Sequence, residues 1–148
     1  MELGAHMSIA GGCDKALTAA AAFDMTACQI FTKNANQWKA KPLDPLAIER
    51  FADVRAATGI RHLVAHDSYL INLGSPDDDL REKSRLAFRD ELDRCDLLGV
   101  PYLVTHPGAA MAGTVSDGLA RVATAINAIH DERPDGTTTV LLETTAGQ

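Results

Sequence analysis

The 148-residue sequence lacks the features of several protein classes. No apolar run approaches the roughly 18 residues that a membrane-spanning helix needs. The N-terminal residues 1–6 contain neither the basic nor the apolar segment of a secretory signal. The three cysteines lie far apart and form no CxxC pair, so neither a disulfide framework nor a cysteine zinc site is predicted. We therefore expect a cytoplasmic protein with no membrane partner.

Two nucleotide-binding motifs are also missing. No GxGxxG follows the first apolar run, and no GxxxxGK[ST] occurs, which argues against the dinucleotide-binding and P-loop forms of an α/β sheet. The net charge of −6 argues mildly against nucleic acid, because duplex DNA attracts lysine and arginine. The charges are uneven, however: three lysines and no acid lie in 31–41, and the acids gather at 77–79 and in 82–96. Net charge alone does not decide the partner.

Short apolar runs alternate with longer amphipathic stretches. Strands are expected at Leu3–His6, Cys28–Phe31, Arg61–His66, Pro101–His106 and Thr138–Glu143. Helices are expected at Asp14–Ala22, at Pro42–Thr58 with Asp44 as its cap, from a cap at Ser75 or Asp77 to Leu98, and at Ser116–His130 with Ser116 as its cap. In the third helix the apolar residues share one stripe and the charges are expected opposite. This alternation predicts a parallel sheet with helical crossovers, either an open doubly wound sheet or part of a (β/α)8 barrel.

The ends of the expected strands favour the barrel. Four of the five strands end in a residue that can bind a metal, namely His6, His66, His106 and Glu143. In TIM barrels the functional residues lie at the carboxyl ends of the strands, on one common face. In three of these strands an apolar residue precedes the polar one by two positions, on the same side: Val64, Val104 and Leu141. Since a full barrel takes about 250 residues, we expect residues 1–148 to be the N-terminal part of one barrel domain, with about four and a half βα units, truncated at its C-terminal end.

The cluster of His66, His106 and Glu143 is the candidate metal site. Imidazole nitrogens and a carboxylate suit zinc or a similar divalent ion, and leave room for a water whose pKa the metal lowers. Each residue alone is equally compatible with a hydrogen-bonded core histidine or a capping carboxylate. His6 shares the strand-end position, but its segment suits hydrogen bonding equally well.

Two segments offer groups for nucleic acid. Residues 66–74 place Tyr69, Leu70 and Ile71 beside the candidate site, where they can wedge between base pairs or pack under the next helix. Residues 31–38 offer a lysine for phosphates and amides for bases or phosphates, or form a solvated loop with the tryptophan as an anchor. The residues concerned are Lys33, Asn34, Asn36, Gln37 and Trp38.

Five motifs, in order along the whole chain, resemble endonuclease IV. They are Gly4–Ser8 with Ala10–Gly12, Phe31–Asn34 with Gln37–Trp38, His66–Gly74, His106–Gly108 and Glu143–Gln148. The stretch from His66 to Gly74 is the most specific. The resemblance implies a TIM-barrel apurinic/apyrimidinic endonuclease of base excision repair. Such an enzyme hydrolyses the phosphodiester 5′ to an abasic site in double-stranded DNA, through a cluster of three zinc ions, and leaves a 3′-hydroxyl.

Carried over by position, the resemblance implies roles for individual residues. His66 and His106 would bind one zinc ion and Glu143 would bridge it to a second, so that all three act in catalysis through the metal. His6 and Asp67 are expected to support the ligands. The DNA contacts are expected from Lys33, Asn34, Asn36 and Gln37, with Tyr69 and Leu70 filling the gap in the base stack.

The sequence departs from the family in two respects. Asn36 stands where the family often has arginine, which makes that contact shorter and neutral. The remaining zinc ligands lie in the family's C-terminal half, so we expect one complete ligand set and no activity from this chain alone. The alternatives are a metal-dependent sugar isomerase or epimerase of similar barrel fold, and a non-catalytic half-barrel. The parent enzyme is expected to be monomeric, whereas the fragment can associate with itself through open sheet edges.

Overall fold

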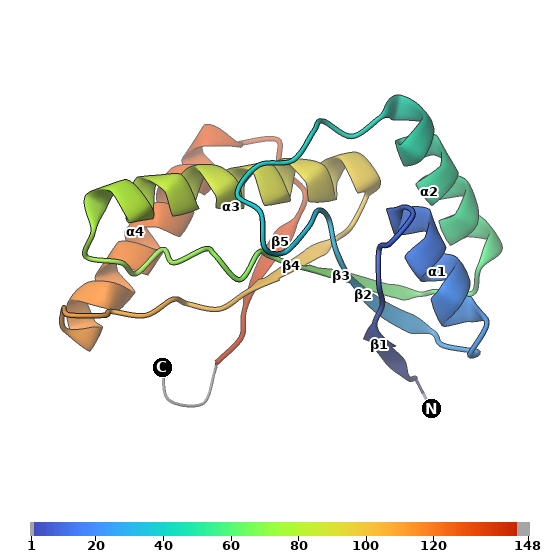
Figure 1. The fold of residues 1–148 in the computed structure, drawn as a ribbon, viewed down its shortest axis with the longest axis horizontal. Coiled ribbons are helices and arrows are strands. Elements are labelled where there is room, and N and C mark those ends of the chain that lie inside the picture. The colour runs from blue at the N-terminus through green and yellow to red at the C-terminus, as the bar shows by residue number, and fades with distance from the viewer. Residues whose placement is uncertain (1, 145–148) are drawn as a thin grey trace.

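The computed structural model describes residues 2–144 (Figure 1). Strands and helices alternate in the order β1 (Gly4–His6), α1 (Cys13–Ala21), β2 (Ala27–Phe31), α2 (Pro45–Ala57), β3 (His62–His66), α3 (Asp78–Leu98), β4 (Tyr102–Thr105), α4 (Val115–Glu132) and β5 (Thr139–Leu142). Residues 145–148, which end the last sequence motif, lie outside the described residues. Within 2–144, no helix combines the length and the apolar character required to cross a membrane.

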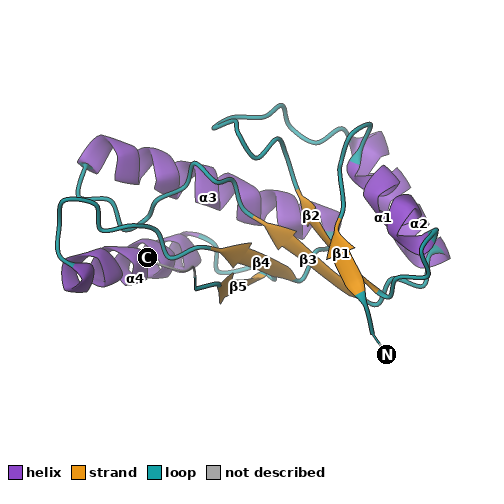
Figure 2. Cartoon of the chain, turned by 60° about the horizontal axis from the view of Figure 1, so that its bottom comes forward, coloured by secondary structure: helices purple, strands orange, loops and turns teal. Residues whose placement is uncertain are grey.

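The five strands form one parallel sheet in the order β1-β2-β3-β4-β5. Strands adjacent in the sequence are thus adjacent in the sheet, and the helices lie along one side of it (Figures 1 and 2). An open doubly wound sheet instead reverses its strand order and carries helices on both faces. The prediction of a partial TIM barrel is therefore confirmed.

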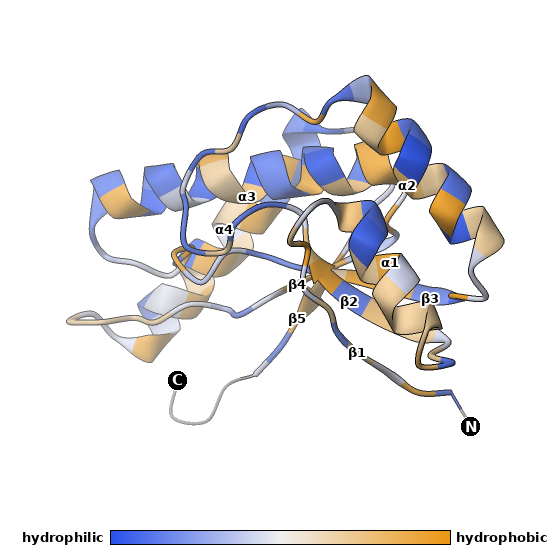
Figure 3. Ribbon diagram, turned by 45° about the vertical axis from the view of Figure 1, so that its right-hand side comes forward, coloured by the Kyte–Doolittle hydropathy of each residue, from blue (hydrophilic) through white to orange (hydrophobic). Residues whose placement is uncertain are grey.

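The core lies between the sheet and the helices, and the alternation of side chains along the strands creates it. Leu63 and Ala65 of β3 and Leu103 of β4 point toward the helices and are at most 1% exposed. The neighbouring residues point to the other face, where Leu141 is 38% exposed. No element within 2–144 covers that concave face. The helices show the matching alternation of hydrophobic and hydrophilic positions in Figure 3.

The structure defines the N-terminal starts of three helices more closely than the sequence does. Helix α2 begins at Pro45 rather than Pro42, because the Asp44 side chain accepts a hydrogen bond from the backbone of Leu46 and caps it there. Asp77, and not Ser75, caps α3. The expected cap Ser116 is wrong: the cap of α4 is Thr114, whose hydroxyl accepts from the backbone N–H of Asp117 at 3.1 Å.

The distribution of charge on α3 also differs from the expectation. Glu91 and Arg94 were expected on the outer face, but their residues are only 1% and 7% exposed. Arg94 donates two hydrogen bonds to the carbonyl of Thr32, at 3.1 and 2.9 Å, and one to the carbonyl of Lys41 at 3.0 Å. The Thr32 hydroxyl donates to the Glu91 carboxylate. The buried stripe of α3 thus carries two charges that bind the segment after β2.

Asp96, at the end of α3, provides a test of this fold. Its carboxylate accepts hydrogen bonds from the backbone N–H groups of Thr137 and Thr138, at 3.2 and 3.0 Å, and pairs with Arg133. Burial raises the pKa of Asp96, but hydrogen bonds from the hydroxyl groups of Thr138 and Thr137, at 2.6 and 3.0 Å, together with the charge of Arg133, outweigh it, so the pKa is lowered overall. We predict that Asp96→Asn lowers the free energy of unfolding at pH 7 by about 2 kcal/mol, measured by urea denaturation.

The pH dependence of this difference follows from its sign. A carboxyl group with a lowered pKa stabilises the fold above its ordinary pKa, and that stabilisation is lost as the pH falls through the folded-state value. The difference between Asp96→Asn and the unmodified chain should therefore shrink below about pH 4. Asp135→Asn, at an exposed position in the same connection, should leave stability unchanged. A difference that stays constant down to pH 2 would contradict the role given to Asp96.

Candidate metal centre

His66, His106 and Glu143 meet at the carboxyl edge of the sheet. One ligand atom from each lies within 4.8 Å of the other two. Nε2 of His66 is 3.6 Å from the Glu143 carboxylate, and the two imidazole centroids are 5.0 Å apart. His66 ends β3, whereas His106 and Glu143 each lie one residue beyond β4 and β5. The parallel register places all three on the concave face, as the two-residue spacing predicts.

The two imidazole rings are oriented so that Nε2 is available for a metal. Nδ1 of His66 lies 2.9 Å from the carbonyl oxygen of Asp67, to which it donates, and Nδ1 of His106 lies 3.3 Å from the carbonyl oxygen of Glu143. Metal-binding histidines are commonly held in this way by an acceptor on the other ring nitrogen. Two imidazole nitrogens and a carboxylate form a donor set that suits zinc. The residues present therefore fit the implied metal.

Asp67 lies behind His66 and joins it to the next strand. One carboxylate oxygen accepts from the Thr105 hydroxyl at 2.5 Å, and the other lies 3.6 Å from Nδ1 of His66. Burial raises the pKa of Asp67 to about 8, and the hydrogen bond from Thr105 offsets only part of that effect. The structure thus places Asp67 in contact with the ligand that it was expected to support.

His6 lies apart from the ligand group. Its Nδ1 is 3.0 Å from the side-chain nitrogen of Gln29, and its ring lies 4.3 Å from that of Phe31. Burial, and to a lesser degree the nearby His66, lowers the pKa of His6. The Phe31 ring in turn packs against His66, with centroids 5.9 Å apart, and against Tyr69, at 5.4 Å.

Phe31 was not singled out from the sequence, although one signal was available. Phe31 ends β2 directly opposite His66 in the register of the sheet. It is an aromatic residue at a strand end where the neighbouring strands carry polar residues. Its ring therefore connects His6, the candidate ligand His66 and the exposed Tyr69.

The segment 32–41 follows β2 and contains four of the expected DNA contacts. Asn34, Asn36 and Gln37 are exposed, and the Asn36 backbone donates to the Asn34 side chain at 2.9 Å. Lys33 differs from them, since it is 4% exposed and its ammonium lies 2.8 Å from the Asp90 carboxylate and 3.6 Å from that of Glu91. The amides are thus open to a ligand, whereas the lysine is bound to α3.

The segment 67–75 follows β3 and presents one large side chain to solvent. Tyr69 is 63% exposed and Leu70 is half-buried, whereas Ile71 and Leu73 belong to the core. The two residues expected to form a wedge thus lie beside His66, with the Tyr69 side chain at the surface and the ring centroids of His66 and Tyr69 5.8 Å apart. For Ile71, packing under the next helix is the correct interpretation.

Asn72 joins this segment to the one that follows β4. Its side-chain nitrogen donates to the carbonyl of Ala109 at 3.0 Å, and its oxygen accepts from the Ala109 N–H at 3.1 Å. Gly108 has a φ of +93°, and a Cβ there would lie 2.3 Å from the Asn72 oxygen. The glycine beside His106 is therefore required by the approach of Asn72.

Comparison with known proteins agrees with this geometry. A family model described as "Xylose isomerase-like TIM barrel" matches residues 17–148. The chain is 52% identical to "Probable endonuclease 4" of Chloroflexus aggregans, over 98% of this chain and 51% of that protein. The crystal structure of endonuclease IV from Thermus thermophilus superposes with a TM-score of 0.87 and 36% identity, over 100% of this chain and 53% of that one.

A D-tagatose 3-epimerase-like protein also superposes, with a TM-score of 0.72 over 100% of this chain and 54% of that one, but its 19% identity shows the fold alone. The chain spans about half the length of the curated relatives that it matches. It belongs to the xylose isomerase-like TIM barrel family and, within it, corresponds to the N-terminal half of endonuclease IV.

Proposed function

We propose that this chain carries the N-terminal part of a DNA repair endonuclease. The reaction is hydrolysis of the phosphodiester 5′ to an abasic site in double-stranded DNA, leaving a 3′-hydroxyl. The observation that carries this proposal is the convergence of His66, His106 and Glu143 beside the exposed Tyr69. It is supported by the 52% identity to probable endonuclease 4 proteins.

Zinc is the metal that we propose for this site. When bound, zinc supplies Lewis acidity, which polarises a phosphodiester oxygen and lowers the pKa of a water molecule. His66 and His106 would bind through Nε2, since Nδ1 of each faces a backbone carbonyl. Glu143 is exposed and has two carboxylate oxygens, so it can bind the same ion as His66 and bridge to a second one. Asp67 and Thr105 keep the His66 backbone in register with β4.

Two exposed loops would contact the DNA. Tyr69, with Leu70 beside it, would fill the space left in the base stack. Asn34, Asn36 and Gln37 would contact phosphates or base edges, since their side chains are exposed. Lys33 was expected to bind a phosphate, but its burial against Asp90 and Glu91 supports a different role, in which it orders the loop.

Two further proposals concern the length of the chain. His66, His106 and Glu143 would complete one metal site and share in a second, so incision would require ligands from outside this chain. The edges at β1 and β5 and the concave face are open within 2–144, and they would bind either the rest of a barrel or a second copy. A sugar epimerase remains a candidate only through the fold, at 19% identity.

Zinc content is the first test of the proposed site. We expect the purified chain, after dialysis, to retain about one zinc ion or fewer, measured by mass spectrometry of the metal. His106→Ala should abolish this binding, because two remaining ligands hold zinc weakly. His130→Ala, on the exposed surface of α4, should leave the zinc content unchanged. Retention of zinc by His106→Ala would remove His106 from the site.

The second test uses a duplex that contains one tetrahydrofuran abasic analogue. The chain should bind it in preference to the undamaged duplex, measured by fluorescence anisotropy, and should not cut it. Tyr69→Ala should reduce this preference about tenfold, as expected for the loss of one stacking contact. Tyr102→Ala is the matched control, since Tyr102 is exposed at the opposite end of β4.

Equal binding of the two duplexes would contradict the proposed function. Incision 5′ to the analogue by the chain alone would instead contradict the requirement for further ligands.

A further inference from the structure

A buried hydroxyl connects the first loop, residues 32–41, to the second loop, residues 67–75. Both loops lie beside the metal group, the cluster of His66, His106 and Glu143. Ser68 is 2% exposed and its hydroxyl donates to the carbonyl of Ala35 at 2.6 Å. The same oxygen accepts from the Leu70 backbone at 3.3 Å. Ala35 lies near the middle of 32–41 and is 8% exposed. Because it is buried, water does not readily replace the Ser68 hydroxyl as the hydrogen-bond donor to its carbonyl. Ser68 therefore bonds both loops at once.

A second contact joins the end of β2 to the second of these loops. The ring of Phe31, the last residue of β2, packs edge-on against Tyr69, with centroids 5.4 Å apart. It also packs against the ligand His66. Ser68 thus holds the first loop from the second, while Phe31 packs against Tyr69 from the end of β2, and both contacts lie next to the candidate metal site.

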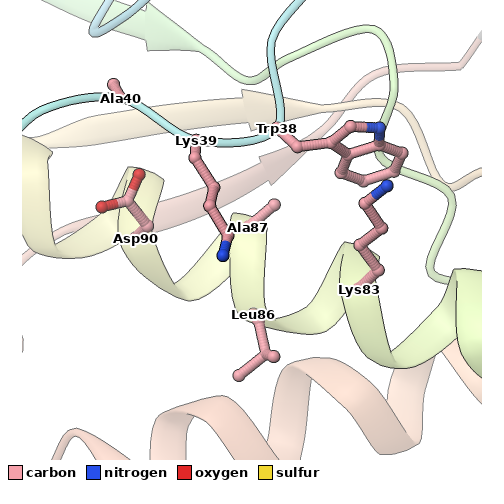
Figure 4. A pocket seen from close by; sticks show the side chains of 7 residues that line it. All are labelled: Trp38, Lys39, Ala40, Lys83, Leu86, Ala87 and Asp90. Carbon is pink, nitrogen blue, oxygen red and sulfur yellow. The ribbon is translucent and has the colours of Figure 1, made fainter.

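The outer side of the first loop is held less closely. Arg94 binds its two ends through the carbonyls of Thr32 and Lys41. Between those ends the Lys83 side chain points toward the Trp38 ring (Figure 4), and its ammonium lies 4.3 Å from the ring centroid. A hollow of about 280 Å³ separates the segment 38–40 from α3, with Leu86 and Ala87 among its lining. Together with the Lys33 ion pairs, these contacts with α3 reach residues 32, 33, 38 and 41, and among the described residues no hydrogen bond or ion pair joins 34–37 to α3.

We propose that Ser68 is a positioning residue that fixes the middle of this loop relative to His66 and Tyr69. It thereby sets where Asn34, Asn36 and Gln37 stand beside the metal group, so that the two loops meet a ligand as one rigid surface. The consequence for DNA rests on the proposed function, whereas the effect on the loop does not.

Hydrogen exchange is the deciding measurement. The Asn36 and Gln37 amides donate within the loop, to the Asn34 side chain and carbonyl, so their exchange reports its opening. In Ser68→Ala the carbonyl of Ala35 loses its partner, and the exchange of these two amides should rise about tenfold. Ser68→Thr retains a hydroxyl and should restore the protection.

Two further variants guard this result. Ser68→Cys, with a weaker donor, should give an intermediate rate and serves if the alanine variant does not fold. Thr138→Val is the matched control: Thr138 is also buried, and its hydroxyl donates to the Asp96 carboxylate at 2.6 Å, at the opposite edge of the sheet. It should lower the stability of the chain without a selective rise in exchange at Asn36 and Gln37.

Duplex binding gives the functional readout. Ser68→Ala should weaken binding to the abasic-analogue duplex by about threefold to tenfold, with zinc content unchanged, and Ser68→Thr should bind as the unmodified chain does. Unchanged exchange in Ser68→Ala, or an equal rise in Thr138→Val, would overturn the positioning role. A rise in exchange with no loss of duplex affinity would overturn its consequence for DNA. Failure of the unmodified chain to prefer the abasic duplex would overturn the proposed function alone, since exchange still decides whether Ser68 fixes the loop.

Discussion

The packing of α3 against the sheet is the interaction on which the rest of the structure depends. Phe88, Leu92 and Cys95 are fully buried on the face that meets the strands, and they remove a large apolar area from water. The same buried stripe includes Glu91 and Arg94, which bind the segment after β2. Because burying unpaired charges is unfavourable, these two groups need their partners, and the loop is held where it supplies them. One helix thus forms much of the core and fixes the two ends of the first loop.

The metal group depends on the same alternation of side chains. Parallel strands in register bring their carboxyl ends to one edge, and the side chains that alternate away from the core line the concave face. His66, His106 and Glu143 therefore converge although they lie far apart in the sequence. Ser68 and Asn72 then join the three loops at that edge, each by a hydrogen bond to backbone. The strands thus position the three candidate ligands, whereas hydrogen bonds between the loops hold the loops in place.

The fold could be predicted from the sequence in large part, and the site in smaller part. The spacing of apolar runs predicted every strand and helix, because burial on one face imposes periods of two and 3.6 residues. Helix starts were less certain, since Thr114 and Ser116 are both good caps and only geometry selects between them. Lys33 was expected to contact DNA, but it is buried against carboxylates on a helix almost 60 residues away in the sequence.

The sequence by itself determined which residues can bind a metal and at which strand ends they lie, since His66, His106 and Glu143 follow apolar rows of fixed parity. It also determined the family, through five motifs in order. The tertiary structure alone decided that Glu91, Arg94 and Lys33 serve as anchors, that Gly108 makes room for Asn72, and that Ser68 joins two loops. These relations are distances between segments remote in the chain, and local propensity contains no information about which buried partner a polar group will meet.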